Sequence, residues 1–593
     1  MTRTPLRPLA RILEARARGE NPDAIERENL RLRQEEMRDR ARRRAEGRLL
    51  VLAALFFCAF GLVGGRMALL AQSEPGEPRT SVAGARILAQ RADITDREGR
   101  ILATNFDTHS LYAQPRDMVD PGHAADRLVE IFPSLDRARL MRDFTGDRKF
   151  LWIRKTISPE QQQAVHDIGE PGLLFGPREM RLYPNGRLAA HVLGGASFGR
   201  EGVHAAEVVG VAGVEKYLDD RLRDPARAHE PLTLSLDLSV QAAMEQVLHG
   251  GMRIMNAKGA SGILMEVETG EVVAAASLPD FDPNDRPSLP TTGHQDDSPL
   301  FNRAVQGVYE LGSVFKVFTI AQALDLGLAT PDTMINTESP MTWGRFRIRD
   351  FRNYGPELSL SDVIVKSSNV GTARIAMDIG ATRQRAFLDE LGFMQASPLE
   401  ITEASGSKPL LPKNWSEIST MTISYGHGLS TSPMHLAAAY ATMANGGRKI
   451  VPTLLRDDAN APGARVMSET TAAALRKMLR EVVTEGTASL GEVAGYAVGG
   501  KTGTADKPNP TGGYYEDKVI STFASVFPAD DPKYVLVVTL DEPVETSGSE
   551  PRRTAGWTAV PVAAETIRRI APLLGLRPTI EPLDLAAIRQ ASN

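Results

Sequence analysis

The chain has 593 residues and a formal net charge of only −5 at neutral pH. Apolar residues make up 42% of it and charged residues 24%, which describes a folded protein too long for one typical domain. This charge balance gives no indication of nucleic-acid binding, which needs a strongly basic surface.

The first 71 residues predict a cytoplasmic leader followed by a membrane anchor. Residues 1–48 hold 14 arginines against 9 acidic residues, a net charge of +5. An uncharged run covers residues 49–65, and the apolar character continues past Arg66 to Ala71. A basic leader before an apolar run predicts a single transmembrane helix over 49–71, with its N-terminal side in the cytoplasm. The alternative is a cleaved signal peptide, whose basic region is usually far shorter than this leader.

Residues 72–228 predict a non-catalytic domain. A linker covers about 72–82, and short strands and helices follow without a candidate nucleophile, metal cluster or paired carboxylates. The only cysteine, Cys58, lies in the predicted span, so the exported part must fold without disulfides. The histidines occur singly, and we expect them to be structural or exposed and not metal ligands. We therefore predict a mixed pedestal domain that holds the next domain away from the membrane.

Residues 229–577 predict a larger α+β domain, and 578–593 a C-terminal tail. Two hairpins are indicated, one joining 260–267 to 271–277 and one joining 519–527 to 534–540. Ser432-Pro433 predicts the start of a helix that ends at Gly446-Gly447. Strands at both ends of the domain with helices between them indicate an antiparallel sheet flanked by helices.

A serine and a lysine three residues apart, Ser313 and Lys316, begin an apolar run that closes at Gly327. Residues three apart share one face of a helix, so the Lys316 amine can lie one turn from the Ser313 hydroxyl. Burial beside Phe315 and near another cation favours loss of the lysine proton, which makes Lys316 a candidate general base. The same spacing occurs at Ser405 and Lys408, but that copy leads directly into Pro409 without an apolar helix, and we interpret it as a loop coincidence.

Two further motifs accompany this pair. Ser367-Ser368-Asn369 precedes an apolar helix over 370–377, where the serines could also be a simple helix cap. Lys501-Thr502-Gly503-Thr504 follows a strand-like segment over 494–500, whose glycines allow close approach of another group. The backbone N–H groups of Ser313 and Thr504 could then form an oxyanion hole, while Lys501 and Thr502 donate to a substrate carboxylate.

These three motifs, in this order, resemble those of class B penicillin-binding proteins, and within them the cell-division branch. The likeness extends from about residue 85 to about 570. It includes segments that resemble the family outside the active site: 91–103, 181–184, 191–194, 213–215, 425–428 and 432–447. Two positions depart from the family pattern, Leu311 in place of proline and His435 in place of glutamine.

The resemblance implies a peptidoglycan D,D-transpeptidase that needs neither metal nor organic cofactor. Ser313 is then the nucleophile, Lys316 its base and Ser367 a proton shuttle. Asn369 binds a substrate amide, and Lys501, Thr502, Gly503 and Thr504 form the carboxylate and oxyanion side. The implied ligands are peptidoglycan stem peptides and, as covalent inhibitors, β-lactams. The implied partners are a polytopic, FtsW-like glycosyltransferase and other division proteins, at the septum of the inner membrane with the catalytic domain in the periplasm.

Several alternatives share the three motifs. An elongation-specific class B transpeptidase differs in cellular role, and a serine β-lactamase needs a deacylating base for which the sequence offers no convincing glutamate. A β-lactam sensor normally has several membrane spans, whereas this sequence predicts one. A catalytically silent scaffold of a division or elongation complex is the non-enzyme alternative. The three intact motifs argue against it, because a protein without catalytic activity does not need them.

Overall fold

A computed structural model describes residues 7–21, 23–24, 27–28, 31–32, 34–38, 52–64, 91–201, 206–456, 462–509 and 512–579. The chain divides into two compact units, Met1–Ala85 and Arg86–Asn593. The first unit contains helix α1 (Arg7–Ala17) and a helical stretch over residues 52–64, which includes an exposed Cys58. Within the described ranges no helix combines the length and the apolar character needed to span a membrane. The rest of the predicted span over 49–71 lies outside those ranges.

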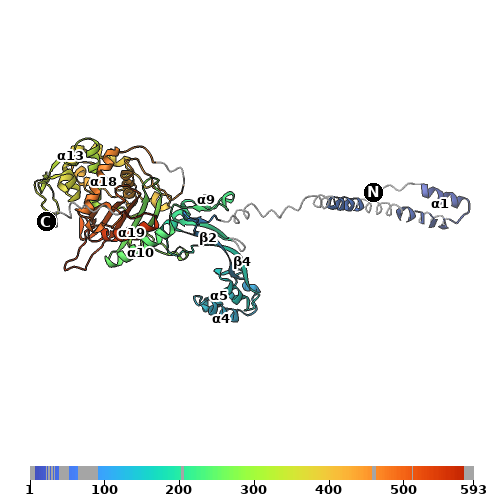
Figure 1. Ribbon diagram of the computed structural model, residues 1–593. Coiled ribbons are helices and arrows are strands. Elements are labelled where there is room, and N and C mark those ends of the chain that lie inside the picture. The colour runs from blue at the N-terminus through green and yellow to red at the C-terminus, as the bar shows by residue number, and fades with distance from the viewer. Residues whose placement is uncertain are drawn as a thin grey trace. The chain divides into compact units, whose positions relative to one another are not determined.

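The sheet nearest the start of the second unit combines residues from both predicted domains. Its strands have the order β3-β2-β1-β7, and β4 pairs with β2. The strands are β1 (Ile94–Thr95), β2 (Ile101–Ala113), β3 (Leu151–Ile157), β4 (Leu173–Leu182) and β7 (Leu232–Thr233). β1 pairs in parallel with β7, so residues 94–95 and 232–233 lie side by side. The long antiparallel pair β2 and β4 leads to a lobe with helices α4 (Pro121–Ile131) and α5 (Arg137–Phe144) (Figure 1).

That lobe has a hydrophobic core of its own. Leu111 of β2, Leu128 of α4, Phe144 of α5 and Val165 of α6 (Pro159–His166) are buried together there. Two further strands, β5 (Gly195–Glu201) and β6 (Ala206–Ala212), form an antiparallel pair, and helices α7 (Ala190–Leu193), α8 (Gly213–Tyr217) and α9 (Asp219–Leu222) lie around them in the sequence.

Three buried charged side chains, Arg91, Arg181 and Glu215, connect segments of this region that are distant in the sequence. Glu215 of α8 is fully buried and accepts hydrogen bonds from Arg91 Nε at 2.6 Å and from Arg181 Nε at 2.7 Å. Tyr183 donates its hydroxyl to the same carboxylate at 3.2 Å. Since buried charges are stable only when paired and hydrogen-bonded, this network fixes β4, α8 and the segment before β1 relative to one another.

The sheet of the larger predicted domain is antiparallel throughout, with the order β14-β15-β16-β8-β9. Its strands are β8 (Gly259–Glu266), β9 (Val272–Leu278), β14 (Gly499–Pro508), β15 (Tyr514–Phe527) and β16 (Tyr534–Asp541). Both predicted hairpins are confirmed. β8 and β9 are buried along almost their whole length, which is why their sequences are nearly continuous runs of small and apolar residues.

Helices pack against this sheet, as the α+β prediction required. α10 (Leu238–Ile254) and α19 (Ala559–Leu573) pack against each other and against its strands (Figure 1). The remaining long helices are α11 (Lys316–Asp325), α13 (Asn369–Ile379), α14 (Ala381–Glu390), α16 (Glu417–Ser424), α17 (Pro433–Ala444) and α18 (Glu469–Thr484).

Helix α17 begins as the sequence predicted and tolerates the unusual His435. Ser432 is its N-cap, and the Ser432 hydroxyl lies 2.7 Å from His435 Nδ1. His435 Nε2 lies 2.8 Å from the carbonyl oxygen of Gln395. The imidazole therefore has a hydrogen-bond partner on each side, and the departure from the family residue leaves the helix start intact.

Candidate active site

Ser313 lies on a short 3₁₀ turn, Gly312–Phe315, and α11 starts only at Lys316. The Ser313 side chain is partly exposed, whereas Lys316 is fully buried. Gly312 has a φ of 64°, and a Cβ at this position would lie 2.6 Å from the Thr504 carbonyl oxygen. Glycine thus allows the turn to contact strand β14, which brings Ser313 to the third motif.

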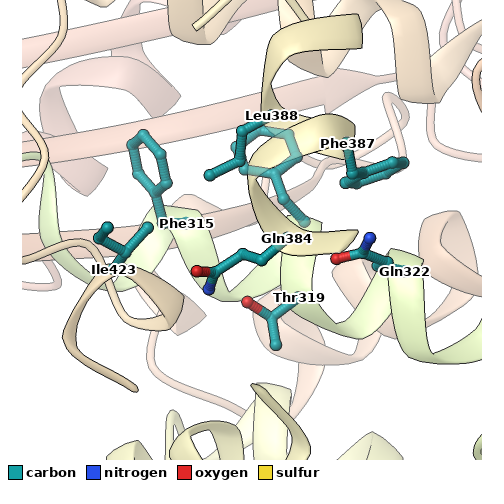
Figure 2. Close-up of a pocket in the computed structure, with 8 residues that line it drawn as sticks. Phe315, Thr319, Gln322, Gln384, Phe387, Leu388 and Ile423 are labelled. Carbon is teal, nitrogen blue, oxygen red and sulfur yellow. The ribbon is translucent and has the colours of Figure 1, made fainter. Parts of the chain in front are cut away.

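The other side of this turn rests on a packed layer. Phe315, Thr319 and Gln322 point toward Gln384, Phe387 and Leu388 of α14 and Ile423 of α16 (Figure 2). The two amides are satisfied, because Gln384 Nε2 donates to Thr420 O at 2.9 Å and Gln322 Nε2 to Arg383 O at 2.7 Å. A void of about 10 Å³ is all that remains between these side chains, so the Ser313 turn has a close-packed support.

The middle motif combines a cap with a strained residue. Ser368 is the N-cap of α13 and accepts a hydrogen bond from Gly371 N at 3.0 Å, so the simple capping interpretation is correct for this serine. Ser367 has a φ of 62°, a left-handed conformation that a non-glycine residue rarely adopts. This backbone turns the Ser367 hydroxyl toward two lysines.

The third motif lies within a strand and not after one, which corrects the prediction for 494–500. β14 begins at Gly499 and contains all four residues of the motif, because it pairs with β15 in a continuous register. It is the edge strand of the sheet. A Cβ on Gly503 would lie 2.2 Å from the Leu311 carbonyl oxygen, so only glycine permits β14 and the Ser313 turn to lie this close.

The two lysines converge on one hydroxyl. Lys316 Nζ lies 3.0 Å from Ser367 Oγ and 2.6 Å from Ser367 O, and Lys501 Nζ lies 3.0 Å from the same Oγ. Lys501 also donates to the Thr502 carbonyl at 3.1 Å. Within the described part of the chain, Ser313 Oγ forms no hydrogen bond with either lysine. The structure thus brings Lys316, Ser367 and Lys501 into direct contact and places Ser313 one turn away.

The remaining predicted residues lie around this centre. Asn369 is partly exposed, and its Nδ2 donates to the Arg349 carbonyl at 3.0 Å. The Thr502 hydroxyl lies 2.7 Å from that of Thr487, and Thr504 Oγ1 accepts from Ala555 N at 3.0 Å. Ser405, by contrast, ends a four-residue helix and donates to the carbonyl of Thr402, outside the site.

Burial changes the protonation of both lysines. Burial and the neighbouring Lys501 cation lower the pKa of Lys316 well below its ordinary value. Burial alone lowers the pKa of Lys501 to about 7. Burial therefore favours the neutral, proton-accepting form of Lys316, whereas Lys501 keeps its charge below about pH 7 and loses it above.

Asp350 is a residue of the site that the sequence analysis missed. Its carboxylate accepts hydrogen bonds from Ser368 Oγ at 2.7 Å and from the backbone N–H groups of Asn369 and Val370 at 2.5 and 3.0 Å. A carboxylate at a helix N-terminus is favoured by the helix dipole. No motif surrounds Asp350 in the sequence, so only the fold identifies it.

Across the described residues, no three His, Cys, Asp or Glu side chains gather in a way that could hold a metal ion.

Comparison with known proteins decides the family. The profile of the penicillin-binding protein transpeptidase domain matches residues 260–564, and that of the penicillin-binding protein dimerisation domain matches residues 86–226. The chain is 34% identical over 551 residues to the probable peptidoglycan D,D-transpeptidase FtsI of Caulobacter vibrioides, covering 91% of this chain and 90% of that protein. The chain belongs to the class B penicillin-binding proteins.

Other relatives of this class B penicillin-binding protein agree. It is 32% identical over 572 residues to the probable peptidoglycan D,D-transpeptidase PenA of Neisseria gonorrhoeae, covering 92% of this chain and 95% of that one. The crystal structure of penicillin-binding protein 3 from Mycobacterium tuberculosis complexed with ampicillin has a TM-score of 0.64 at 25% identity, covering 84% of this chain and 97% of that chain. This class B penicillin-binding protein is thus a penicillin-binding transpeptidase with a two-domain, α+β fold.

Proposed function

We propose that this protein is a peptidoglycan D,D-transpeptidase of septal cell-wall synthesis. The observation that carries the proposal is the convergence of two buried lysines on the Ser367 hydroxyl, one turn from the partly exposed Ser313, with the pKa of Lys316 lowered well below its ordinary value. This arrangement provides a nucleophile, a base and a proton route in one place. Relatives named FtsI support the septal role.

In the first half of the reaction Ser313 Oγ attacks the carbonyl carbon of the D-Ala-D-Ala bond, and Lys316 takes the hydroxyl proton. The proton passes through Ser367 to the leaving nitrogen, the C–N bond breaks, and D-alanine departs from the acyl-enzyme. In the second half the amine of a neighbouring strand attacks the ester and regenerates Ser313 with a cross-link formed.

The substrate is held from two sides. β14 is an edge strand, so a stem peptide can add to it as a further strand, with Lys501, Thr502 and Gly503 near its terminal carboxylate. The N–H groups of Ser313 and Thr504 serve as the oxyanion hole, and Asn369 binds a substrate amide. β-Lactams acylate the same serine, and the M. tuberculosis structure complexed with ampicillin supports this part.

The organisation of the whole chain is part of the proposal. Residues 1–48 form the cytoplasmic leader, 49–71 the single inner-membrane helix, 72–228 the pedestal, 229–577 the periplasmic transpeptidase domain and 578–593 the tail. The basic leader before an apolar run supports this topology. The partners are an FtsW-like glycosyltransferase and other division proteins. A fluorescent fusion should gather at midcell; even labelling of the side wall would favour an elongation role instead.

Labelling with a fluorescent penicillin tests the catalytic assignment. The wild-type protein should form a covalent adduct on Ser313, and Ser313→Ala should abolish it, since loss of a nucleophile costs on the order of a million-fold in rate in other serine hydrolases. Ser405→Ala is the matched control, because Ser405 has the same lysine spacing but lies outside the site, and it should label normally. An adduct located on Ser405 by tandem mass spectrometry would refute the assignment.

A further inference from the structure

A small hairpin beside the active site has an unusual surface. Strands β11 (Met341–Trp343) and β12 (Phe346–Ile348) pair with Trp343 opposite Phe346, so the turn contains only Gly344 and Arg345. Gly344 has a φ of 58°, which a tight two-residue hairpin turn requires. The hairpin and the loop that follows it, residues 341–354, are called the arginine hairpin below.

One side of the arginine hairpin is anchored in the protein. Met341 and Ile348 are buried and pack with Val370 and Ala373 of α13 and Met421 of α16. Three aromatic side chains of the arginine hairpin are nevertheless exposed: Trp343 by 38%, Phe346 by 43% and Phe351 by 81%. Large aromatic side chains left in water on an otherwise anchored hairpin indicate a binding surface.

Four exposed arginines belong to the same hairpin. They are Arg345, Arg347, Arg349 and Arg352, and among the residues that the structure describes none of them forms an ion pair. The Arg345 guanidinium lies 5.2 Å from the centre of the Phe346 ring, and that of Arg352 lies 6.0 Å from the Phe351 ring. The nearest carboxylate in the sequence, Asp350, is already used by the start of α13. Residues 341–354 hold four arginines against one carboxylate, a net charge of 4 − 1 = +3, which favours an anionic ligand.

The arginine hairpin is also continuous with the active site. Asn369 of the middle motif donates to the Arg349 carbonyl, and Asp350 of the hairpin caps the helix on which Asn369 lies. Residues 349 and 350 of the arginine hairpin are therefore in direct contact with the first turn of α13, which contains Asn369.

We propose that the arginine hairpin binds the peptidoglycan strand beyond the reacting peptide, an inference that rests on the proposed function. The strand is a polyanion, because its peptides have free carboxylates, and guanidinium groups bind carboxylates through paired hydrogen bonds. Its sugar rings offer apolar faces on which Trp343 and Phe351 can stack. Three features of the arginine hairpin match this ligand. Its net positive charge suits the carboxylates, its exposed aromatic rings suit the sugars, and its contact with Asn369 places it next to the middle motif.

Binding of soluble, phosphate-free peptidoglycan fragments tests the proposal. The variant Arg345→Gln/Arg347→Gln/Arg352→Gln keeps the backbone and removes three charges. The matched control, Arg253→Gln/Arg385→Gln/Arg448→Gln, removes three exposed arginines that lie elsewhere in the transpeptidase domain. Each protein is titrated with fragments and with fragments whose carboxylates have been amidated, and its acylation by a small β-lactam is measured in parallel.

The hairpin variant should bind native fragments at least about tenfold more weakly than the wild type and the control. Amidation should weaken binding to the wild type by a similar factor, and β-lactam acylation should be equal in all three proteins. Equal fragment affinity in the two variants, or wild-type affinity that amidation leaves unchanged, would overturn the proposal. Normal acylation together with such a result leaves the proposed function standing, whereas failure of Ser313 acylation in the wild type would refute that function itself.

Discussion

Two buried lysines share one hydroxyl, and this is the central chemical fact at the scale of single residues. Ser367 Oγ is 3.0 Å from both amines, and both lysines are fully buried. Two charged ammonium groups buried so close together repel each other, so protonation of one opposes protonation of the other. The charge on Lys501 therefore adds to burial in lowering the pKa of Lys316. It follows that the two amines have different roles although they belong to the same residue type.

Exchange of each lysine for arginine should separate these roles. Lys316→Arg should nearly stop β-lactam acylation, because arginine cannot give up its proton and so cannot act as the base. Lys501→Arg should retain part of the rate, since the charge that faces the substrate carboxylate is kept. Stopped-flow measurement of the acylation rate constant checks both; equal, mild losses in the two variants would contradict the assignment.

The same pair predicts a pH profile. Acylation of the free enzyme should rise with pH as Lys316 loses its proton, and fall again as Lys501, with its pKa lowered to about 7, loses its charge. In Lys501→Arg the falling limb should move to higher pH, because arginine stays protonated there. An alkaline limb at the same pH in both proteins would show that Lys501 is not its source.

At the scale of elements, the start of α13 is held by a carboxylate from another part of the chain. Asp350 accepts hydrogen bonds from Ser368, Asn369 and Val370, and so it fixes the first turn on which Asn369 lies. The serine cap alone satisfies only one of the N–H groups that a helix leaves free at its start. The position of Asn369 therefore depends on both residues.

Replacement of Asp350 by alanine should slow acylation more than it lowers stability. We expect a loss of about tenfold or more in the acylation rate constant, because small displacements of positioning groups are costly in catalysis. The loss of a helix cap should reduce the free energy of unfolding by only about 0.5–2 kcal/mol. Asp362→Asn is the control, since Asp362 pairs with Lys366 near the same motif without contacting Asn369. Parallel loss of acylation in both variants would argue against a positioning role.

At the scale of the second compact unit, the buried network around Glu215 joins segments far apart in the chain. Arg91, Arg181 and Glu215 are separated by up to 124 residues, yet two of their contacts are 2.6 and 2.7 Å. The parallel pairing of β1 with β7 then connects this region to the start of the catalytic domain. Removing the Glu215 charge leaves Arg181 buried without its carboxylate partner, while Arg91 retains its ion pair with Asp219 at 2.7 Å.

Glu215→Gln should consequently destabilise the protein while keeping the side-chain volume. The expected cost is about 3–5 kcal/mol, typical for breaking a buried ion pair, and it should appear as a clearly lower melting temperature. Asp126→Asn, which removes the partner of Arg137 on the exposed surface of the lobe, should melt like the wild type. Identical melting of all three proteins would mean that the network contributes little to stability.

The sequence by itself determined the local structure and the chemistry of this protein. Both sheet hairpins, the Ser432 cap of α17 and the helix after the middle motif follow from periodicity and capping residues, which act over a few neighbouring positions. The three motifs identified the family, because their residue types and order are specific together. Strand β14 was misplaced by several residues, since glycines and a lysine mark a strand poorly until its pairing with β15 is known.

Only the tertiary structure decided how the site is assembled. Lys501 and Ser367 are 134 residues apart in sequence, and their contact depends on β14 packing against the Ser313 turn through Gly312 and Gly503. The left-handed conformation of Ser367 and the role of Asp350 likewise depend on packing between distant segments. Local preferences cannot specify such contacts, because they are fixed by burial and close packing of the whole domain. The sequence identifies the three motifs, and the fold sets the distances, the pKa values and the neighbours of their side chains.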